Sequence, residues 1–226
     1  MNSQPLNLYA VVPADEIPEL QTAVAGEFDL VAWGPFAAIV GAGPRQLRTT
    51  AAALLHDRVV QVAMEHCSTV LPFRLGTCLD DAIEVSSVLE LNAPGLARQL
   101  QRLRGRVEMG MKARMNPPPS DGGPSGLGLR FFQGLGGLRN LAPLHTDRRE
   151  RFTRKEERSL FDGRYLVARA DVDLFWSAVM ALRESMPSVP MLASGPWAPY
   201  SFAEVALIAG SGRPGEPGRE VRDAPN

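Results

Sequence analysis

The hydrophobic positions in the first third of the chain switch between strand-like and helix-like spacing. Residues 6–12 (LNLYAVV) form an apolar run that predicts a strand, and residues 15–26 (DEIPELQTAVAG) predict a short helix. Two further strand-like runs, residues 29–33 and 35–40, flank a glycine and predict a compact hairpin.

The clearest helix is predicted over residues 45–66. Its apolar residues recur at helical spacing and are Leu47, Ala51, Leu54, Leu55, Val59, Val62 and Ala63. Residues 68–75 are again rich in strand formers. The resulting order of strand, helix, strand, strand, helix, strand predicts a ferredoxin-like domain, with an antiparallel sheet and both helices on one face.

The pattern continues with a predicted helix over residues 80–105 and a half-buried strand over residues 107–115 (VEMGMKARM). A second strand-helix-strand unit follows over residues 164–194. The sequence therefore predicts an α+β protein with a ferredoxin-like domain at residues 1–79, a connecting helix at 80–106 and a second, smaller α+β domain at 107–209.

The second domain is predicted to carry an irregular or helical insertion at residues 116–163. Residues 116–128 (NPPPSDGGPSGLG) have the composition of a flexible segment. Residues 147–158 (DRRERFTRKEER) are a charge run, which favours a solvated helix face or a mobile loop over a phosphate site because acidic residues are interleaved. Residues 210–226 have the composition of a disordered tail.

Composition excludes several classes of protein. The formal net charge of -1 argues against a nucleic-acid binder, which needs a basic excess. Cys67 and Cys78 are the only cysteines, which argues against a disulfide scaffold and fits a reducing compartment. The sequence has no apolar run long enough to span a bilayer and no signal-peptide pattern, so we expect a cytoplasmic protein without a membrane span.

The residues that could carry chemistry do not form a known catalytic or metal motif. His56 and His66 are ten positions apart on the predicted helix, about 15 Å along its axis, which is too far to share one ion. Cys67 adjoins His66, but no second cluster of ligands supports the pair. The sequence also lacks a G-x-S-x-G nucleophile elbow. We therefore predict no catalytic, cofactor-binding or metal-binding residue.

The string VLPFRLGTCL at residues 70–79 places one arginine inside a strand-like apolar run. Pro72 is expected at a sheet edge or a bulge, where a missing donor is tolerated. Strand alternation would turn Phe73 and Leu75 to one side and Arg74 to the other. Arg74 is a candidate clamp to the region around residues 80–84 or to the second domain, and this interpretation is favoured over direct contact with a partner.

A second string, ASGPWAPYSF at residues 193–202, alternates aromatic residues with prolines. Prolines fix the backbone, so Trp197, Tyr200 and Phe202 are held on a stiff frame and suit interface anchors. The alternative is a strand exit whose aromatic residues cover the core of the second domain.

Four segments in order resemble the gas vesicle accessory protein F/L family (GvpF/GvpL). They are LYAVV, LLHDRVVQVAMEH running into TVLPFRLGT, LARQLQRLRGRVEMGMKA, and LASGPWAPYSFAE. The resemblance implies a modified ferredoxin-like domain followed by an α+β domain with a helical coiled-coil element. The chain departs from the family where the helical pair is expected, because that region is rich in Gly and Pro and then charged. It also has Ala198 where proline is expected.

The same resemblance implies a non-enzymatic role in gas vesicle assembly. The expected partners are the small hydrophobic shell protein, bound during vesicle nucleation, and other gas vesicle accessory proteins, and the chain could be a minor component of the vesicle. Two other functions stay open from the sequence. One is a metabolite-sensing ferredoxin-like module, and the other is a haem-binding enzyme on an α+β barrel with His56 or His66 as axial ligand.

Overall fold

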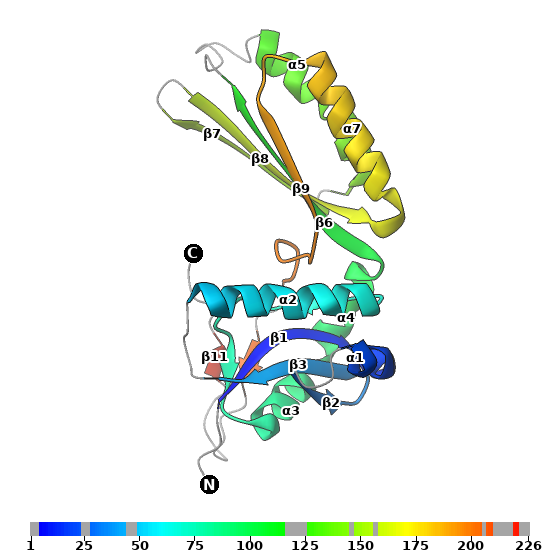
Figure 1. The fold of residues 1–226 in the computed structure, drawn as a ribbon, viewed down its shortest axis with the longest axis vertical. Helices are drawn as coiled ribbons and strands as arrows, with labels where there is room; N and C mark the ends of the chain where they lie inside the picture. The colour runs from blue at the N-terminus through cyan, green and yellow to red at the C-terminus, as the bar shows by residue number, and fades with distance from the viewer. Residues whose placement is uncertain are drawn as a thin grey trace. The chain divides into compact units, whose positions relative to one another are not determined.

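The computed structural model describes residues 5–23, 28–43, 49–115, 126–144, 147–155, 158–204, 207–209 and 219–221. The chain forms two compact units, and Figure 1 labels most of their elements. Unit 1 consists of Met1–Arg104 together with Ala198–Asn226, and unit 2 consists of Gly105–Trp197. Unit 2 is therefore inserted into the sequence of unit 1.

Unit 1 is built on an antiparallel sheet with the strand order β2-β3-β1-β4, and β5 also pairs with β1. Its elements are β1 (Leu6–Pro13), α1 (Ile17–Ala23), β2 (Asp29–Trp33), β3 (Phe36–Ala42), α2 (Thr50–His66), β4 (Leu71–Pro72), β5 (Cys78–Leu79), α3 (Ala82–Leu91), α4 (Ala93–Leu103), β10 (Leu207–Ala209) and β11 (Arg219–Val221). The predicted order from the first strand to the fourth is confirmed.

Both faces of this sheet are covered. Consecutive residues of β1 and β3 are buried along nearly their whole length, although side chains in a strand point alternately to opposite faces. Helices α1 and α2 contact each other, and α2 packs on β1. Helix α3 contacts β2, β3 and β5, and Figure 1 shows it on the side of the sheet opposite α2.

The prediction of a single helix over residues 80–105 is wrong, because the structure has two helices in this range. Helix α3 begins after Asp81, whose carboxylate accepts hydrogen bonds from the backbone N–H groups of Ile83 and Glu84. Its last residue is Leu91, and Asn92 caps its C-terminus. Helix α4 then starts with Pro94 in its first turn. Proline lacks the N–H that would continue the α3 ladder, so the helix is interrupted at this point.

Helix α2 buries Val59 and Ala63, as predicted, but not Leu54 and Leu55. Its buried residues are His56, Val59, Val60, Ala63 and Met64, whereas Leu54 and Leu55 are 66% and 43% exposed. The helix begins after Thr49, whose hydroxyl accepts a hydrogen bond from Ala52 N–H. The first residues of the predicted helix, 45–48, lie outside the described residues.

Unit 2 is a four-stranded antiparallel sheet with the order β7-β8-β6-β9 and helices on one face (Figure 1). Its elements are β6 (Arg106–Met115), α5 (Gly126–Gly134), α6 (Gly136–Leu141), β7 (Arg148–Lys155), β8 (Arg158–Ala168), α7 (Val172–Ser185) and β9 (Met191–Trp197). Helix α7 contacts β8 and β9, α6 contacts β8, and both α5 and α6 contact α7.

The charge run at residues 147–158 is a strand, so the prediction of a helix face or loop is wrong. It contains the whole of β7, which pairs in continuous register with β8, from Arg148 opposite Tyr165 to Lys155 opposite Arg158. The region before it is helical despite its glycines, because Phe131 and Leu138 are fully buried. Residues 116–125 lie outside the described residues. Of the predicted tail, Arg219–Val221 pairs with β10, and the rest of 210–226 is not described.

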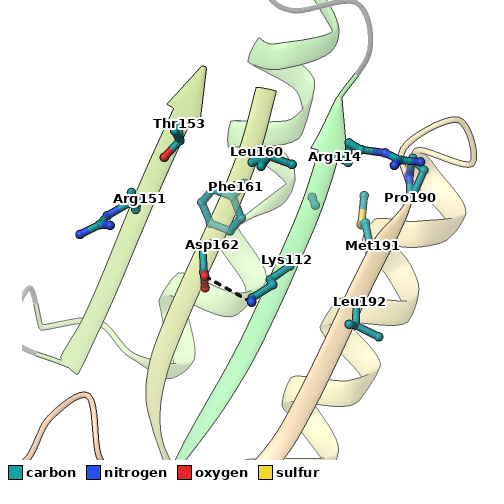
Figure 2. Close-up of a pocket in the computed structure, with 11 residues that line it drawn as sticks. Lys112, Arg114, Arg151, Thr153, Leu160, Phe161, Asp162, Pro190, Met191 and Leu192 are labelled. Carbon is teal, nitrogen blue, oxygen red and sulfur yellow. Dashed lines mark ion pairs between the residues drawn. The ribbon is translucent and has the colours of Figure 1, made fainter. Parts of the chain in front are cut away.

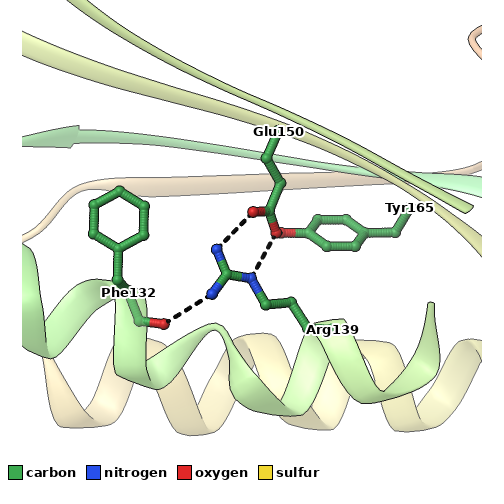
Figure 3. A network of polar contacts seen from close by, with 4 residues as sticks. All are labelled: Phe132, Arg139, Glu150 and Tyr165. Atoms are coloured by element: carbon green, nitrogen blue, oxygen red, sulfur yellow. Dashed lines mark hydrogen bonds and ion pairs between the residues drawn. The ribbon is translucent and has the colours of Figure 1, made fainter. Parts of the chain in front are cut away.

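A polar network fastens α6 to the sheet of unit 2 (Figure 3). Arg139 donates from Nε and Nη2 to the two carboxylate oxygens of Glu150, at 3.0 and 2.6 Å, and from Nη1 to the Phe132 carbonyl at 3.5 Å. The hydroxyl of Tyr165 donates to the same carboxylate at 3.0 Å. Burial raises the pKa of Glu150, but the hydrogen bonds from Arg139 and Tyr165 outweigh it and hold that pKa below its usual value.

Candidate functional site

The string at residues 70–79 lies along the edge of the unit 1 sheet. β4 and β5 are both short and both pair with β1, and the loop between them closes through Phe73 N–H to the Tyr9 carbonyl at 2.9 Å and Leu8 N–H to the Thr77 carbonyl at 2.8 Å. Pro72 stands in β4, the edge strand, as predicted.

Arg74 lies in the turn between these two strands and is exposed. Its carbonyl accepts hydrogen bonds from the Thr77 N–H at 3.1 Å and the Thr77 hydroxyl at 2.9 Å. Phe73 is buried and Arg74 is exposed, as strand alternation predicted. The cause is different, because Arg74 lies in a turn and the alternation of a strand does not continue through a turn. The role of Arg74 as a clamp stays a prediction.

His56 of α2 connects to this string. It is 5% exposed, and its Nε2–H donates to the Phe73 carbonyl at 2.9 Å. Burial lowers the pKa of His56, while the hydrogen bond to Phe73 and the charge of Asp57 act in the opposite direction and are smaller. The imidazole is therefore neutral at pH 7.

Two tyrosine rings lie against His56. The ring of Tyr9, from β1, stands edge-on at a centroid distance of 5.3 Å, and the ring of Tyr200 is tilted by 33° at 6.3 Å. Tyr200 comes from the second unusual string, so both strings meet at His56 within unit 1. Sequence reasoning tested His56 only as a metal ligand. The signal for its structural role was its spacing from Val59, Val60 and Ala63, which defines the buried stripe.

The predicted aromatic anchors occupy three different environments. Trp197 is the last residue of β9 in unit 2 and is 41% exposed. Tyr200 is 37% exposed and belongs to unit 1. Phe202 is fully buried, and its carbonyl accepts a hydrogen bond from Arg102 Nη1 at 3.3 Å. Phe202 therefore covers the core of unit 1, and the prediction that it is a surface anchor or covers the second domain is wrong.

The segment that carries Tyr200 is held by a compact turn. Tyr200 N–H donates to the Ala198 carbonyl at 2.8 Å, and Phe202 and Ala203 N–H groups donate to the Pro199 carbonyl at 3.0 and 2.9 Å. These hydrogen bonds and the burial of Phe202 fix the backbone that carries Tyr200. Its exposed part is thus presented on a fixed frame.

The Tyr200 ring lies against His56 of α2 and is close enough to Asp57 to feel its charge. We use the name Tyr200 surface for Tyr200 together with Asp57 and Leu54 on the exposed side of α2. Burial raises the pKa of the Tyr200 hydroxyl above its ordinary value, and the negative charge of Asp57 adds to this effect. Leu54 is one helical turn before Asp57 and is 66% exposed. The surface is mainly apolar and aromatic, with one carboxylate.

The polar groups of this arrangement hold the backbone in place. The buried imidazole of His56 uses its Nε2 to hold the Phe73 backbone. Over the ranges that the structure describes, no three His, Cys, Asp or Glu side chains come together as a metal site. In the same part of the chain, no helix combines the length and apolarity needed to cross a membrane.

Comparison with known proteins gives consistent matches. The family described as gas vesicle synthesis protein GvpL/GvpF matches residues 6–122 and 137–204. Gas vesicle protein F2 of Halobacterium salinarum is 27% identical over 72% of both chains. Gas vesicle protein L of a Streptomyces species is 28% identical over 69% of this chain and 70% of its own length.

Solved structures share the fold. The crystal structure of the gas vesicle protein GvpF from an Anabaena species superposes with a TM-score of 0.71 at 19% identity, covering 90% of this chain and 98% of that one. GvpF from Microcystis aeruginosa gives a TM-score of 0.65 at 14% identity, covering 89% and 99%. The α+β fold expected from the sequence is confirmed by these likenesses.

Proposed function

Because the chain belongs to the gas vesicle synthesis protein GvpL/GvpF family, we propose that it is a non-enzymatic assembly protein that binds the small hydrophobic shell protein during vesicle nucleation. It would act in the cytoplasm together with other gas vesicle proteins and could stay in the vesicle as a minor component.

The observation that carries this proposal is the Tyr200 surface. A shell subunit that has not yet assembled exposes apolar surface, and such surface aggregates unless another protein covers it. The Tyr200 surface offers an exposed leucine, Leu54, and a partly exposed tyrosine, Tyr200, both on unit 1. Aromatic side chains on a stiff frame lose little entropy on binding, which makes them effective anchors.

The surroundings of the surface support binding over chemistry. The hydrogen bonds of His56, Phe73 and the segment after Trp197 all hold the backbone in place. Asp57 is the one acidic group of the surface, and it would be placed at the rim of a contact whose centre is apolar.

The experiment is co-expression of the full chain with the shell protein encoded in the same organism. We expect the two proteins to co-purify, and we expect the chain to reduce light scattering when the shell protein is diluted from denaturant. Tyr200→Ala and Leu54→Gln should weaken both effects. Leu91→Gln is the matched control, because Leu91 is also an exposed leucine of unit 1, on α3.

Tyr200→Phe separates the ring from the hydroxyl and should behave like the parent. If Tyr200→Ala and Leu54→Gln stay folded and reduce scattering as well as the parent, the binding face lies elsewhere on the molecule. If the parent neither co-purifies with the shell protein nor reduces scattering, the proposed function is wrong.

A further inference from the structure

The sheet of unit 2 has one face that its helices leave open. Helices α5, α6 and α7 lie on the other face (Figure 1). On the open face, side chains from all four strands line a groove of about 540 Å³ (Figure 2). The groove contains charged residues from the centre of the sheet together with leucines that a covered sheet would bury.

The strand register places these side chains in two rows across the sheet. In the first row, Arg151 of β7 lies opposite Asp162 of β8, which lies opposite Lys112 of β6, and Lys112 lies opposite Leu192 of β9. In the second row, Leu160 of β8 lies opposite Arg114 of β6. Neighbouring strands are about 4.8 Å apart, so each row presents charged and apolar groups at regular intervals.

The groove carries an excess of positive charge. Three of its charged lining residues are positive, Lys112, Arg114 and Arg151, and one is negative, Asp162. Asp162 is shared between Lys112 at 3.7 Å and Arg164 at 3.2 Å. Within the part of the chain that the structure describes, Arg114 and Arg151 form no ion pair. Two guanidinium groups are thus available for an anionic partner.

The apolar part of the groove is exposed as well. Leu192 is 66% exposed and Leu160 is 45% exposed, and each lies directly opposite a cationic residue of β6. A ligand that neutralised only the cations would leave these leucines in water. A partner that combines carboxylates with an apolar stripe would satisfy both features, because it would cover the leucines and pair the arginines.

We propose that this open face binds an acidic amphipathic helix of a partner protein. The apolar stripe of the helix would lie on Leu160 and Leu192, and its flanking carboxylates would pair with Arg114 and Arg151. A helix is about 10 Å wide with its side chains, so it covers two to three strands and reaches both rows. This inference goes beyond the proposed function and does not rest on it, since the surface belongs to unit 2 and selects its partner by charge.

A nucleic acid is a poorer match for the same surface. Its phosphates would meet Asp162 at the centre of the first row, and its backbone would leave the leucines uncovered. The formal net charge of the whole chain is -1, which gives no general attraction for a polyanion.

The test is fluorescence anisotropy with the full chain and a labelled synthetic helix of about 18 residues, with leucines at helical i, i+3, i+4, i+7 spacing and glutamates elsewhere. We expect binding that weakens with added salt. The double variant Arg114→Gln/Arg151→Gln should weaken it about fivefold, the size expected for two exposed ion pairs. Leu192→Gln should weaken it as well. The matched controls are Arg130→Gln and Leu174→Gln, which change an exposed arginine and an exposed leucine on the helices of unit 2.

Three results would overturn the proposal. The first is equal binding of a peptide in which lysine replaces every glutamate. The second is equal binding of a scrambled peptide without the apolar stripe. The third is a stable dimer of the parent in sedimentation that Leu192→Gln abolishes, which would make this face a contact between two copies of the chain.

Discussion

Glu150→Gln tests whether a single polar network holds helix α6 to the sheet of unit 2. The substitution keeps the shape of the side chain but removes its charge, and it turns one acceptor oxygen into an N–H₂ group that faces the donors of Arg139. Charge-assisted hydrogen bonds contribute about 1.5–3 kcal/mol each, and breaking a buried ion pair costs about 3–5 kcal/mol. Because the Arg139 side chain is 31% exposed, water can replace part of the lost interaction. We therefore expect a loss of about 2–3 kcal/mol.

Hydrogen exchange followed by mass spectrometry measures this loss where it occurs. Amide exchange in α5 and α6 should speed up about 30- to 150-fold, since about 1.4 kcal/mol corresponds to a factor of ten. Exchange in the helices of unit 1 should not change. Glu184→Gln on α7 is the matched control, because Glu184 is exposed. Unchanged exchange of α6 in Glu150→Gln would refute the reasoning.

The pH dependence gives an independent check of the same network. The pKa of Glu150 is lower in the folded protein than in the unfolded chain. Its contribution to stability is therefore complete above its unfolded pKa of about 4.3 and is lost as the pH falls through the folded pKa. The difference in unfolding free energy between the parent and Glu150→Gln should shrink as the pH is lowered from 5 to about 3.

Two further predictions concern unit 1. The pKa of His56 is lower in the folded protein, so unit 1 should lose stability as the pH falls from about 6.5 toward that folded pKa. His56→Gln should flatten this dependence in urea titrations monitored by far-UV circular dichroism. An equally steep dependence in the variant would contradict the assignment. If Arg74 is a clamp, Arg74→Ala should lower the melting temperature slightly, because an exposed ion pair contributes less than about 1 kcal/mol to stability. An unchanged melting curve together with weaker binding of the shell protein would favour direct contact of Arg74 with the partner.

The sequence predicted elements whose side-chain pattern is decided locally. β1 is a continuous apolar run, whereas β6 and α7 each show one clear period, and all three lie where these patterns place them. The charge run of β7 was misread because its inward-facing residue, Glu150, is compensated by Arg139 and Tyr165, which are distant in sequence. A local pattern cannot show such a partner, so an inward carboxylate looked like a solvated one.

Part of the buried stripe of α2 was missed for a similar reason, although Val59 and Ala63 were among its predicted residues. The stripe with Leu54 and Leu55 is more apolar than the stripe with His56, and local hydrophobicity favours the former. His56 can be buried only because the Phe73 carbonyl accepts its hydrogen bond from 17 residues away. The meeting of the two unusual strings at His56 could not be predicted either, since it depends on the chain leaving unit 2 between Trp197 and Ala198.

The insertion of unit 2 into unit 1 has a consequence for the order in which a new chain folds. All the strands and helices of unit 2 lie in one continuous stretch, whereas unit 1 needs Phe202 to fill its core and Tyr200 to cover His56. At a synthesis rate of about 5–20 residues per second, Phe202 is made roughly 5–20 seconds after α4 is complete. Unit 2 can therefore finish folding first, although it starts later. During that interval the nascent unit 1 carries an unfilled apolar site, and transiently exposed apolar surface of this kind favours aggregation.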